Sequence, residues 1–295
     1  MKKLGILKVE EKLKILEKIR KLRDKGFSYT QIREELLKEG IVISKSTIRR
    51  WDKEITRPAG SSDINISPSP HLSYFLGALL GDGNIRRKKN YKYEIRLRVK
   101  DKDFAEYFAY SLSKILNKSV KVGKERDLTR SGERFSVVVS NKRLWEFLYY
   151  NSLSNLIKIA EKFPQDFLRG LFDAEGSASR SSVGFYNTNK EIINSVVRLL
   201  KRLGIKTKVK VWIHKGEKVR IRNKIYKSNH DILCVLITKK NDIIKFSRLV
   251  GFNISRKRKK LPGGRSVKFF IDSGGSPEAS ISSASCGFEP PTSGL

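Results

Sequence analysis

Cysteine, histidine and acidic residues are scarce in this chain of 295 residues, and each shortage narrows what the protein can be. The two cysteines, Cys234 and Cys286, are too few for the disulfide framework of a small secreted domain. The cysteines and the three histidines share no spacing typical of zinc ligands, so a structural zinc site is not expected.

Long apolar runs are also missing, and none approaches the length of a membrane span. The apolar stretch near the start is interrupted by Lys8, Glu10 and Lys12, which is unlike the apolar region of a signal peptide. The sequence therefore predicts a cytoplasmic protein with no membrane partner.

Negative charge is in short supply as well. Asp and Glu number 30 against 63 Lys and Arg, which makes the formal net charge +33. Residues 71–261 carry most of that excess, with 44 basic residues against 17 acidic ones. Because Lys and Arg that neutralise phosphates supply much of the affinity for nucleic acid, we expect a polyanionic partner, and double-stranded DNA in particular.

The periodicity of residues 1–57 predicts three short helices, with Ser28 and Ser44 as caps of the second and third. Two helices joined by a short turn, the last of them basic, are typical of a helix-turn-helix module. A small helical bundle with a solvated basic face is the alternative. The side chains expected to face a DNA major groove are Lys45, Thr47, Arg49 and Arg50.

Two segments outside the main body have loop composition. Residues 58–70 are rich in Pro and Ser, which predicts a flexible linker that lets the module reach DNA beyond the body. Residues 262–295 are rich in Ser, Gly and Pro, and we expect them to be disordered.

The body contains two imperfect copies of one motif. Residues 75–83 read FLGALLGDG and residues 168–176 read LRGLFDAEG, so that Glu175 follows Asp82 by 93 positions. Each copy opens a pattern of helix, two strands, helix, two strands and helix, over residues 71–165 and 166–261, with the later helices at 102–116, 141–150, 190–203 and 241–250. The sequence therefore predicts an α+β fold of tandem αββαββα repeats related by a pseudo-two-fold axis, preceded by the small all-α module.

Several of the predicted strands alternate apolar and basic residues, which places the two kinds on opposite faces. We expect the apolar face to pack on helices and the uniformly basic face to form a β-saddle on DNA. The apolar residues are Ile95, Leu97, Val99, Val209, Val211, Val219 and Ile221. The basic residues expected to contact DNA are Arg86, Arg87, Arg96, Arg98, Lys100, Lys208, Lys210, Lys218, Arg220 and Arg222.

Each motif ends in an acidic residue followed by a glycine that can end a helix. Small residues recur four positions apart in both motifs, so the two helices can pack closely and bring Asp82 beside Glu175. Paired carboxylates at the negative ends of two helix dipoles repel each other unless a cation lies between them. The pattern predicts a Mg²⁺ site with the backbone carbonyls of Gly81 and Ala174 as further ligands, suited to phosphodiester hydrolysis.

These motifs resemble those of the LAGLIDADG homing endonucleases, in the single-chain form with two repeats that is typical of archaeal intron-encoded members. The resemblance covers about residues 71–255, including the strand-to-helix joins at 99–102 and 187–190. It implies a saddle-shaped monomer that cuts both strands of a long asymmetric DNA target across the minor groove, with Mg²⁺ or another divalent cation such as Mn²⁺ held by Asp82 and Glu175.

The joins also suggest residues around the active site. Family members often have Gln at the position that Asp101 occupies here, and Lys102, Asn189 and Lys190 are the other candidates for the periphery. A non-cleaving relative remains the alternative, as an RNA-splicing maturase that binds its host intron RNA or as a DNA-binding transcriptional regulator. Regulators of this kind tend to lose the acids, and both acids are present here.

Overall fold

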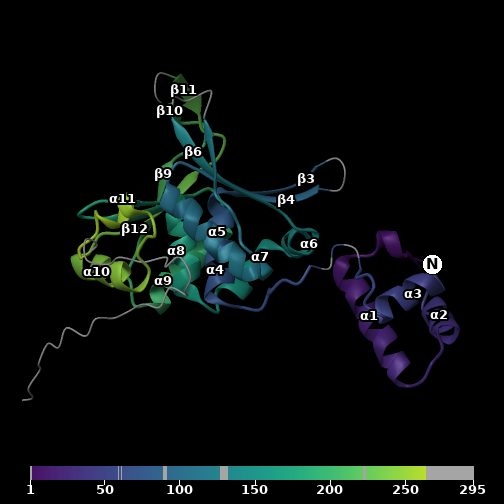
Figure 1. Ribbon diagram of the computed structural model, residues 1–295. Helices are drawn as coiled ribbons and strands as arrows, with labels where there is room; N and C mark the ends of the chain where they lie inside the picture. Colours follow the sequence, from purple (N-terminus) through teal and green to yellow (C-terminus); the bar gives the residue numbers. More distant parts are fainter. Residues whose placement is uncertain are drawn as a thin grey trace, which may run out of the picture.

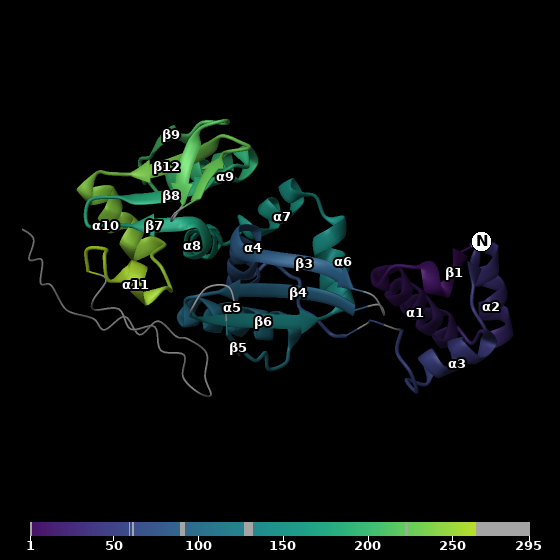
Figure 2. The same cartoon turned by 90° about the horizontal axis from the view of Figure 1, so that it is seen from above.

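The computed structural model describes residues 2–58, 60, 62–88, 92–126, 132–221 and 224–263 (Figure 1). Two α/β halves lie side by side with their helices packed beneath two sheets, and a separate group of helices lies beyond one end of the body (Figures 1 and 2). Residues 264–295, expected to be disordered, and Arg222 lie outside the described residues. Over the described ranges, no helix is long and apolar enough to cross a membrane.

The first half of the body has the expected order of elements, followed by one short extra helix. These elements are α4 (Pro70–Asp82), β3 (Gly83–Lys88), β4 (Lys92–Val99), α5 (Lys102–Leu116), β5 (Gly123–Arg126), β6 (Glu133–Ser140), α6 (Lys142–Tyr150) and the extra α7 (Leu153–Ala160).

The second half repeats this order and inserts a hairpin before its last strand. Its elements are α8 (Pro164–Glu175), β7 (Gly176–Ala178), β8 (Val183–Asn187), α9 (Lys190–Arg202), β9 (Lys208–Ile213), the hairpin strands β10 (Lys218–Ile221) and β11 (Lys224–Lys227), β12 (Ile232–Ile237), α10 (Lys240–Leu249) and the short α11 (Ser255–Arg258).

The two sheets have equivalent topologies. The strand order is β3-β4-β6-β5 in the first half and β7-β8-β12-β9 in the second, and all neighbours are antiparallel. Each motif helix leads directly into the edge strand that follows it in the chain. The predicted tandem αββαββα architecture is therefore confirmed.

The two motif helices, α4 and α8, pack backbone to backbone at the centre of the body. A Cβ atom added to Gly77 would lie 2.3 Å from the carbonyl oxygen of Phe167, and one added to Gly170 would lie 2.3 Å from that of Tyr74. One turn further on, a Cβ on Gly81 would lie 2.3 Å from the Cβ of Ala174. The stripe of small residues therefore acts as predicted, and α4 is buried along most of its length between the two halves.

The first sheet also has the predicted division into faces. Ile95 and Leu97 are fully buried on the helix side, while Arg98 and Lys100 are exposed on the other. The basic face is less uniform than expected, because acidic side chains from the same sheet lie among the arginines. Arg86 pairs with Glu94 at 2.9 Å, for example.

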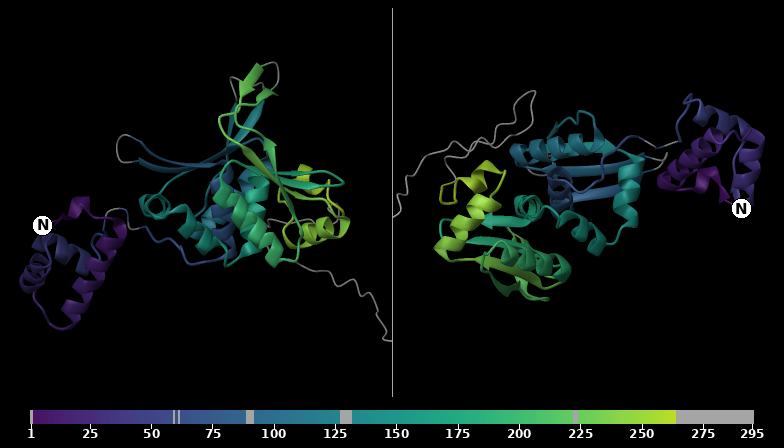
Figure 3. Two further views of the ribbon diagram at one scale, coloured as in Figure 1. Left: turned by 180° about the vertical axis from the view of Figure 1, so that it is seen from behind. Right: turned by 90° about the horizontal axis from the view of Figure 1, so that it is seen from below.

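The second sheet departs further from the prediction. Val209 and Val211 were expected to pack on helices, yet they are 50% and 37% exposed. The reason is that β9 is an edge strand and continues toward the β10–β11 hairpin, which projects away from the helices (Figures 1 and 3). Val219, on β10, lies on this projection and is only half-buried. The apolar faces of these strands therefore have no helix layer to cover them.

The N-terminal module contains α1 (Val9–Asp24), α2 (Tyr29–Lys38) and α3 (Lys45–Asp52). It also contains the short 3₁₀ helix η1 (Leu4–Ile6) and a parallel pair of two-residue strands, β1 (Lys2–Lys3) and β2 (Ile41–Val42). The hydroxyl of Ser28 accepts a hydrogen bond from the Gln31 amide, and that of Ser44 accepts one from the Thr47 amide, so both predicted caps are present. The module has its own apolar core, which includes Ile19, Ile32, Leu36, Ile48 and Trp51.

The segment expected to be a free linker is attached to the body, through Ser62 as well as through its second half. Ile64 is buried in the main apolar core, and the amide of Asn65 donates to the carbonyl oxygen of Ile115 at 2.7 Å. The prediction of a freely reaching linker is therefore wrong for this part. Its Pro and Ser content signals loop structure but does not show whether the loop packs, and the buried Ile64 side chain helps to hold this one in place.

Candidate active site

The two motif acids are the last residues of their helices, Asp82 in α4 and Glu175 in α8. The glycine after each acid does not adopt the left-handed conformation that often ends a helix. Gly83 and Gly176 have φ values of −81° and −85° and lead straight into a strand. Crowding explains both glycines, since a Cβ at Gly176 would lie 2.4 Å from the Phe172 carbonyl oxygen and one at Gly83 would lie 2.4 Å from the Leu79 side chain.

The close packing of α4 on α8 brings the acids together. The Cγ of Glu175 lies 3.3 Å from the position of a Cβ added to Gly81, the residue before Asp82. Burial, followed by the negative charge of Asp82, raises the pKa of Glu175 to about 6. Burial also raises the pKa of Asp82, with a smaller contribution from the charge of Asp101 and an opposing one from Lys257. The negative charge of Asp82 therefore disfavours the charged form of Glu175.

The donor set around the acids fits a hard cation. Neither carboxylate has a hydrogen-bond or ion-pair partner within the part of the chain that the structure describes. The carbonyls of Gly81 and Ala174 lie in the last turns, where backbone oxygens have no intrahelical amide to accept from. The described residues contain no group of three or more His, Cys, Asp or Glu side chains that could hold a metal. A cation here would thus share two carboxylates, backbone oxygens, water and substrate oxygens, as Mg²⁺ commonly does.

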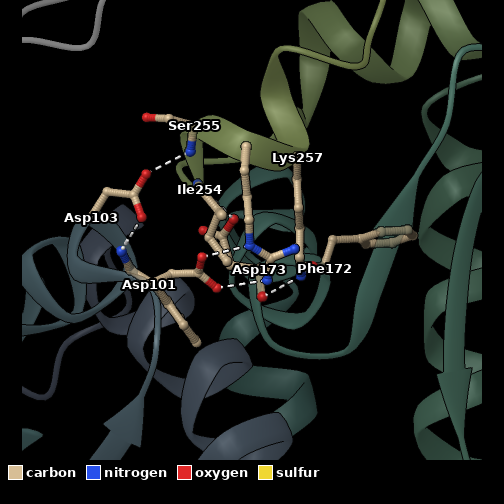
Figure 4. Close-up of polar contacts among 9 residues, drawn as sticks. Asp101, Asp103, Phe172, Asp173, Ile254, Ser255 and Lys257 are labelled. Atoms are coloured by element: carbon tan, nitrogen blue, oxygen red, sulfur yellow. Dashed lines mark hydrogen bonds and ion pairs between the residues drawn. The ribbon is translucent and has the colours of Figure 1, made fainter. Parts of the chain in front are cut away.

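Lys257, in α11, is the first functional candidate that the sequence analysis missed. Its ammonium group is buried and donates to the carbonyl oxygens of Phe172 and Asp173, at 3.0 and 2.6 Å (Figure 4). Burial lowers its pKa to about 8, although the nearby carboxylates of Asp173, Asp101 and Asp82 oppose this shift. A positive charge is thus fixed at the negative end of α8, beside the two acids.

Asp173 is the second missed residue and is completely buried. Its carboxylate accepts hydrogen bonds from the Tyr74 hydroxyl at 2.8 Å and from the backbone and side-chain amides of Asn253, both at 3.0 Å. Burial raises its pKa to about 6. Because Tyr74 belongs to α4 and Asn253 leads into α11, Asp173 joins the two halves and positions the segment that carries Lys257.

Asp101, predicted at the periphery, faces the same segment. Its carboxylate accepts two hydrogen bonds from Arg256, at 2.6 and 2.7 Å, and the neighbouring Asp103 accepts one from the Ser255 amide at 2.5 Å. Figure 4 shows α11 bridged in this way to the start of α5. The structure therefore brings Asp101 close to Asp82 but uses its carboxylate in an ion pair.

The other peripheral candidates have local partners. The Lys102 ammonium lies 3.1 Å from Glu106 in its own helix. The Asn189 side chain caps α9 by accepting from the amides of Glu191 and Ile192. Lys190 is the exposed first residue of that helix.

The two missed residues differ in how visible they are in sequence. Asp173 stands where the first motif has the apolar Leu80, so the repeat itself marks an unusual polar residue. Lys257 lies within a run of basic residues, 256–260, and nothing in the sequence separates it from its exposed neighbours.

The basic residues predicted to contact DNA lie on the sheet surfaces and on the projecting hairpin. Arg98 and Arg96 share Glu125, at 3.0 and 3.4 Å. Lys210 lies over the ring of Trp212, 4.9 Å from its centroid. The remaining predicted residues that the structure places in exposed positions are Arg86, Arg87, Lys100, Lys208, Lys218 and Arg220.

In the N-terminal module, α3 exposes Lys45, Arg49 and Arg50. Thr47 was expected beside them, facing a groove. Its side chain is instead half-buried and lies 2.8 Å from the Ser44 hydroxyl, as part of the helix cap. A threonine three residues after a serine cap is drawn into the capping interaction, which the residue pattern alone did not distinguish.

Comparisons with known proteins match both halves of the body. A family model described as LAGLIDADG-like domain matches residues 162–251, and one described as WhiA LAGLIDADG-like domain matches residues 71–132. The chain is 39% identical over 259 residues to a Methanocaldococcus jannaschii protein named "Uncharacterized protein MJ0398", covering 86% of this chain and 94% of that one.

A second relative has a named activity. The homing endonuclease I-DmoI of Desulfurococcus mucosus is 25% identical over 149 residues, covering 48% of this chain and 75% of the relative. A crystal structure of I-DmoI in complex with DNA and Ca superposes with a TM-score of 0.45 and 21% identity, over 61% of this chain and 88% of that one.

Proposed function

Because the chain belongs to the LAGLIDADG family, we propose that it is a site-specific endonuclease that uses Mg²⁺ or Mn²⁺ to cut both strands of a long asymmetric DNA target. The observation that carries this proposal is the pair of carboxylates, Asp82 and Glu175, held together at the ends of two packed helices without a protein partner among the described residues. A protein that only binds DNA has no need of such a pair.

The acids and the adjoining carbonyls have separate tasks in this proposal. Asp82 and Glu175 would hold the cation, and the carbonyl oxygens of Gly81 and Ala174 would serve as further ligands. A bound divalent cation supplies an activated water molecule and stabilises the charge that develops on the leaving oxygen. Lys257, fixed at 2.6 Å from the Asp173 carbonyl, offsets part of the negative charge of the site.

DNA binding follows from the two sheets and the hairpin. Exposed Lys and Arg on these elements neutralise phosphates, and arginines on a β-ribbon in the major groove can read guanine. Two unlike repeats in one chain suit a monomer on an asymmetric target, since the chain already contains one repeat for each half of the target. A sedimentation measurement that shows an obligate dimer on a palindromic site would contradict this part of the proposal.

A non-cleaving role is the second candidate. The match of residues 71–132 to a WhiA LAGLIDADG-like domain favours a DNA-binding regulator, and a maturase that binds intron RNA has the same general surface requirements. The acids distinguish these functions from an endonuclease, because regulation or RNA binding does not require a paired-carboxylate site.

The deciding experiment incubates the protein with a library of long duplexes in Mg²⁺ or Mn²⁺ and sequences the ends produced. We expect staggered double-strand cuts at one family of sites. Asp82→Asn and Glu175→Gln each remove a cation ligand, and we expect each to reduce cleavage on the order of a thousandfold. DNA affinity should be retained or should rise, because the repulsion between the two carboxylates is relieved.

The matched control is Asp63→Asn, which removes a carboxylate that pairs with Arg57 far from the helix ends. We expect it to leave cleavage unchanged. If the wild-type protein binds duplex but yields no ends with either metal, the protein is a binding relative and the endonuclease proposal is wrong.

A further inference from the structure

The N-terminal module is attached to the first repeat by a specific interface between α1 and α6. The amide of Val9 donates to the Glu146 carboxylate at 2.7 Å, and Arg143 pairs with Glu10 at 2.6 Å. Beside them, the Lys8 ammonium lies 3.7 Å from the centroid of the Tyr150 ring. These contacts join residues more than 130 positions apart, so they are tertiary contacts between two folded units.

Glu146 is the central residue of this interface. Val9 is the first residue of α1, and its amide has no partner inside the helix, so the carboxylate of Glu146 satisfies it and complements the positive end of the helix dipole. The same carboxylate lies 3.5 Å from the Lys142 ammonium. Lys12, one turn along α1, is only 4% exposed and has Glu146 as its nearby negative charge. Removing that charge would leave a buried ammonium without compensation.

The chain between the module and the body is held against the same interface. Gly60 lies between the two units, since a Cβ added there would be 3.1 Å from both the Val9 and the Lys142 side chains. Two residues further, the Ser62 hydroxyl accepts from the side-chain amide of Asn141 at 2.7 Å. The module is therefore held both by its first helix and by its connecting segment.

This arrangement places the module beyond the strands β3 and β4, on the α6 side of the body, in both views (Figures 1 and 2). The basic side chains of α3, Lys45, Arg49 and Arg50, are exposed in this position. A docked module avoids the entropy cost that a freely moving one incurs on binding, because its position relative to the sheets is already set.

We propose that the N-terminal module is a fixed arm, locked to the first repeat through Glu146, which binds duplex DNA flanking the target at a set distance from the sheets. The inference rests on the proposed function of the body as a duplex-DNA-binding unit. It goes beyond that function by assigning an interface and a positioning residue to the module.

Hydrogen exchange on the intact protein tests the lock without any DNA. In the wild-type protein we expect the Val9 amide, which donates to Glu146, to be protected, and in Glu146→Ala we expect it to exchange roughly tenfold faster or more. Amides of α4 and α8 should stay equally protected in both, which shows that the body is folded. The control Glu17→Ala removes a carboxylate from the exposed face of α1 and should change nothing. Unchanged exchange in Glu146→Ala would overturn the lock.

Binding to a 60-bp random-sequence duplex without divalent cations tests the arm. We expect Glu146→Ala to bind roughly tenfold more weakly than the wild type and Glu17→Ala, since unlocking the module lowers its effective concentration at the duplex. Equal affinity of Glu146→Ala and wild type would overturn the DNA role of the arm even if exchange confirms the lock. If the wild type itself fails to bind the duplex, the proposed function fails, and the arm's role in DNA binding fails with it.

Discussion

The two repeats agree at their shared helix interface and differ immediately around it. Gly77 and Gly170 each approach the other helix's backbone, and each motif ends in an acid followed by a crowded glycine. Next to this common centre, the second motif has the buried Asp173 where the first has Leu80. Among the described residues, a helix with a buried lysine, Lys257, follows the second repeat but not the first.

The same contrast appears at the strand-to-helix joins. Asp101 of the first repeat pairs with Arg256, which belongs to the C-terminal segment of the second repeat. Asn189, at the matching join of the second repeat, is used as a helix cap. The pseudo-two-fold symmetry is therefore kept at the helix pair and the acids, where each motif helix must pack against the other. The surroundings are free to diverge, and the two acids consequently lie in unequal environments.

The largest effect on stability is expected from disturbing the contact between α4 and α8, which both repeats share. Gly170→Ala places a Cβ within 2.3 Å of the Tyr74 carbonyl oxygen and must force the two helices apart. We expect the free energy of unfolding to fall by about 3 kcal/mol or more, measured by thermal or denaturant unfolding. Gly5→Ala is the control, since a Cβ at Gly5 meets nothing within 4 Å. A Gly170→Ala protein as stable as the wild type would mean that the helices do not pack as described.

The surroundings of the acids, which differ between the repeats, are tested by Lys257→Met. This substitution keeps the length of the side chain but removes its charge. Two carbonyl oxygens at the end of α8 lose their donor, and a positive charge near the acids is lost. We expect cation-dependent cleavage to fall roughly a hundredfold, comparable with loss of one electrostatic stabiliser, while DNA affinity changes little. The control Lys259→Met replaces an exposed lysine and should retain both cleavage and DNA binding. Equal losses of cleavage and binding would point to a general structural defect instead.

The raised pKa of Glu175 predicts that the stability of the protein depends on pH. The folded-state pKa of Glu175, about 6, lies above its ordinary value of 4.5, so the folded protein binds this proton more tightly than the unfolded chain does. Without metal, the free energy of unfolding should therefore fall as pH rises from about 4.5 to 6, by about 1–2 kcal/mol from this group.

Asp82→Asn sharpens this test, because it removes the negative charge of Asp82 that raises the pKa of Glu175. Burial, the larger cause of the shift, remains. We expect the pKa of Glu175 to drop but to stay above 4.5, and the pH dependence of stability to become shallower. Carboxyl chemical shifts followed by NMR report the pKa directly. An unchanged pKa would show that the two carboxylates are further apart than the helix packing implies.

The smallest predicted effect concerns the exposed strand β9. Lys208→Ala removes one exposed positive charge, predicted to bind phosphate, from a strand at the edge of the second sheet. We expect a modest loss of affinity and a decrease of about one in the slope of log K against log salt. Lys162→Ala, in the exposed turn between helices α7 and α8, should leave the slope unchanged. A shift with Lys162→Ala and none with Lys208→Ala would place the DNA on the other side of the molecule.

Much of the fold could be predicted because it depends on local patterns. Helical spacing located residues 102–116 to the residue, and alternation identified the buried Ile95 and Leu97. The same approach failed for Val209 and Val211, because alternation shows that a strand has two faces but does not show whether a helix covers one of them. It also failed for Ile64, where burial depends on a surface formed by distant parts of the chain.

The sequence by itself determined the repeat, the helix contact through its glycines and the pairing of Asp82 with Glu175, since all three follow from spacing within each motif. Only the tertiary structure decided that Lys257 is buried against the Asp173 carbonyl and that Glu146 caps a helix of the N-terminal module. Each of these groups takes its role from a partner more than 80 positions away, and the burial that gives a charge its effect exists only once the chain has folded.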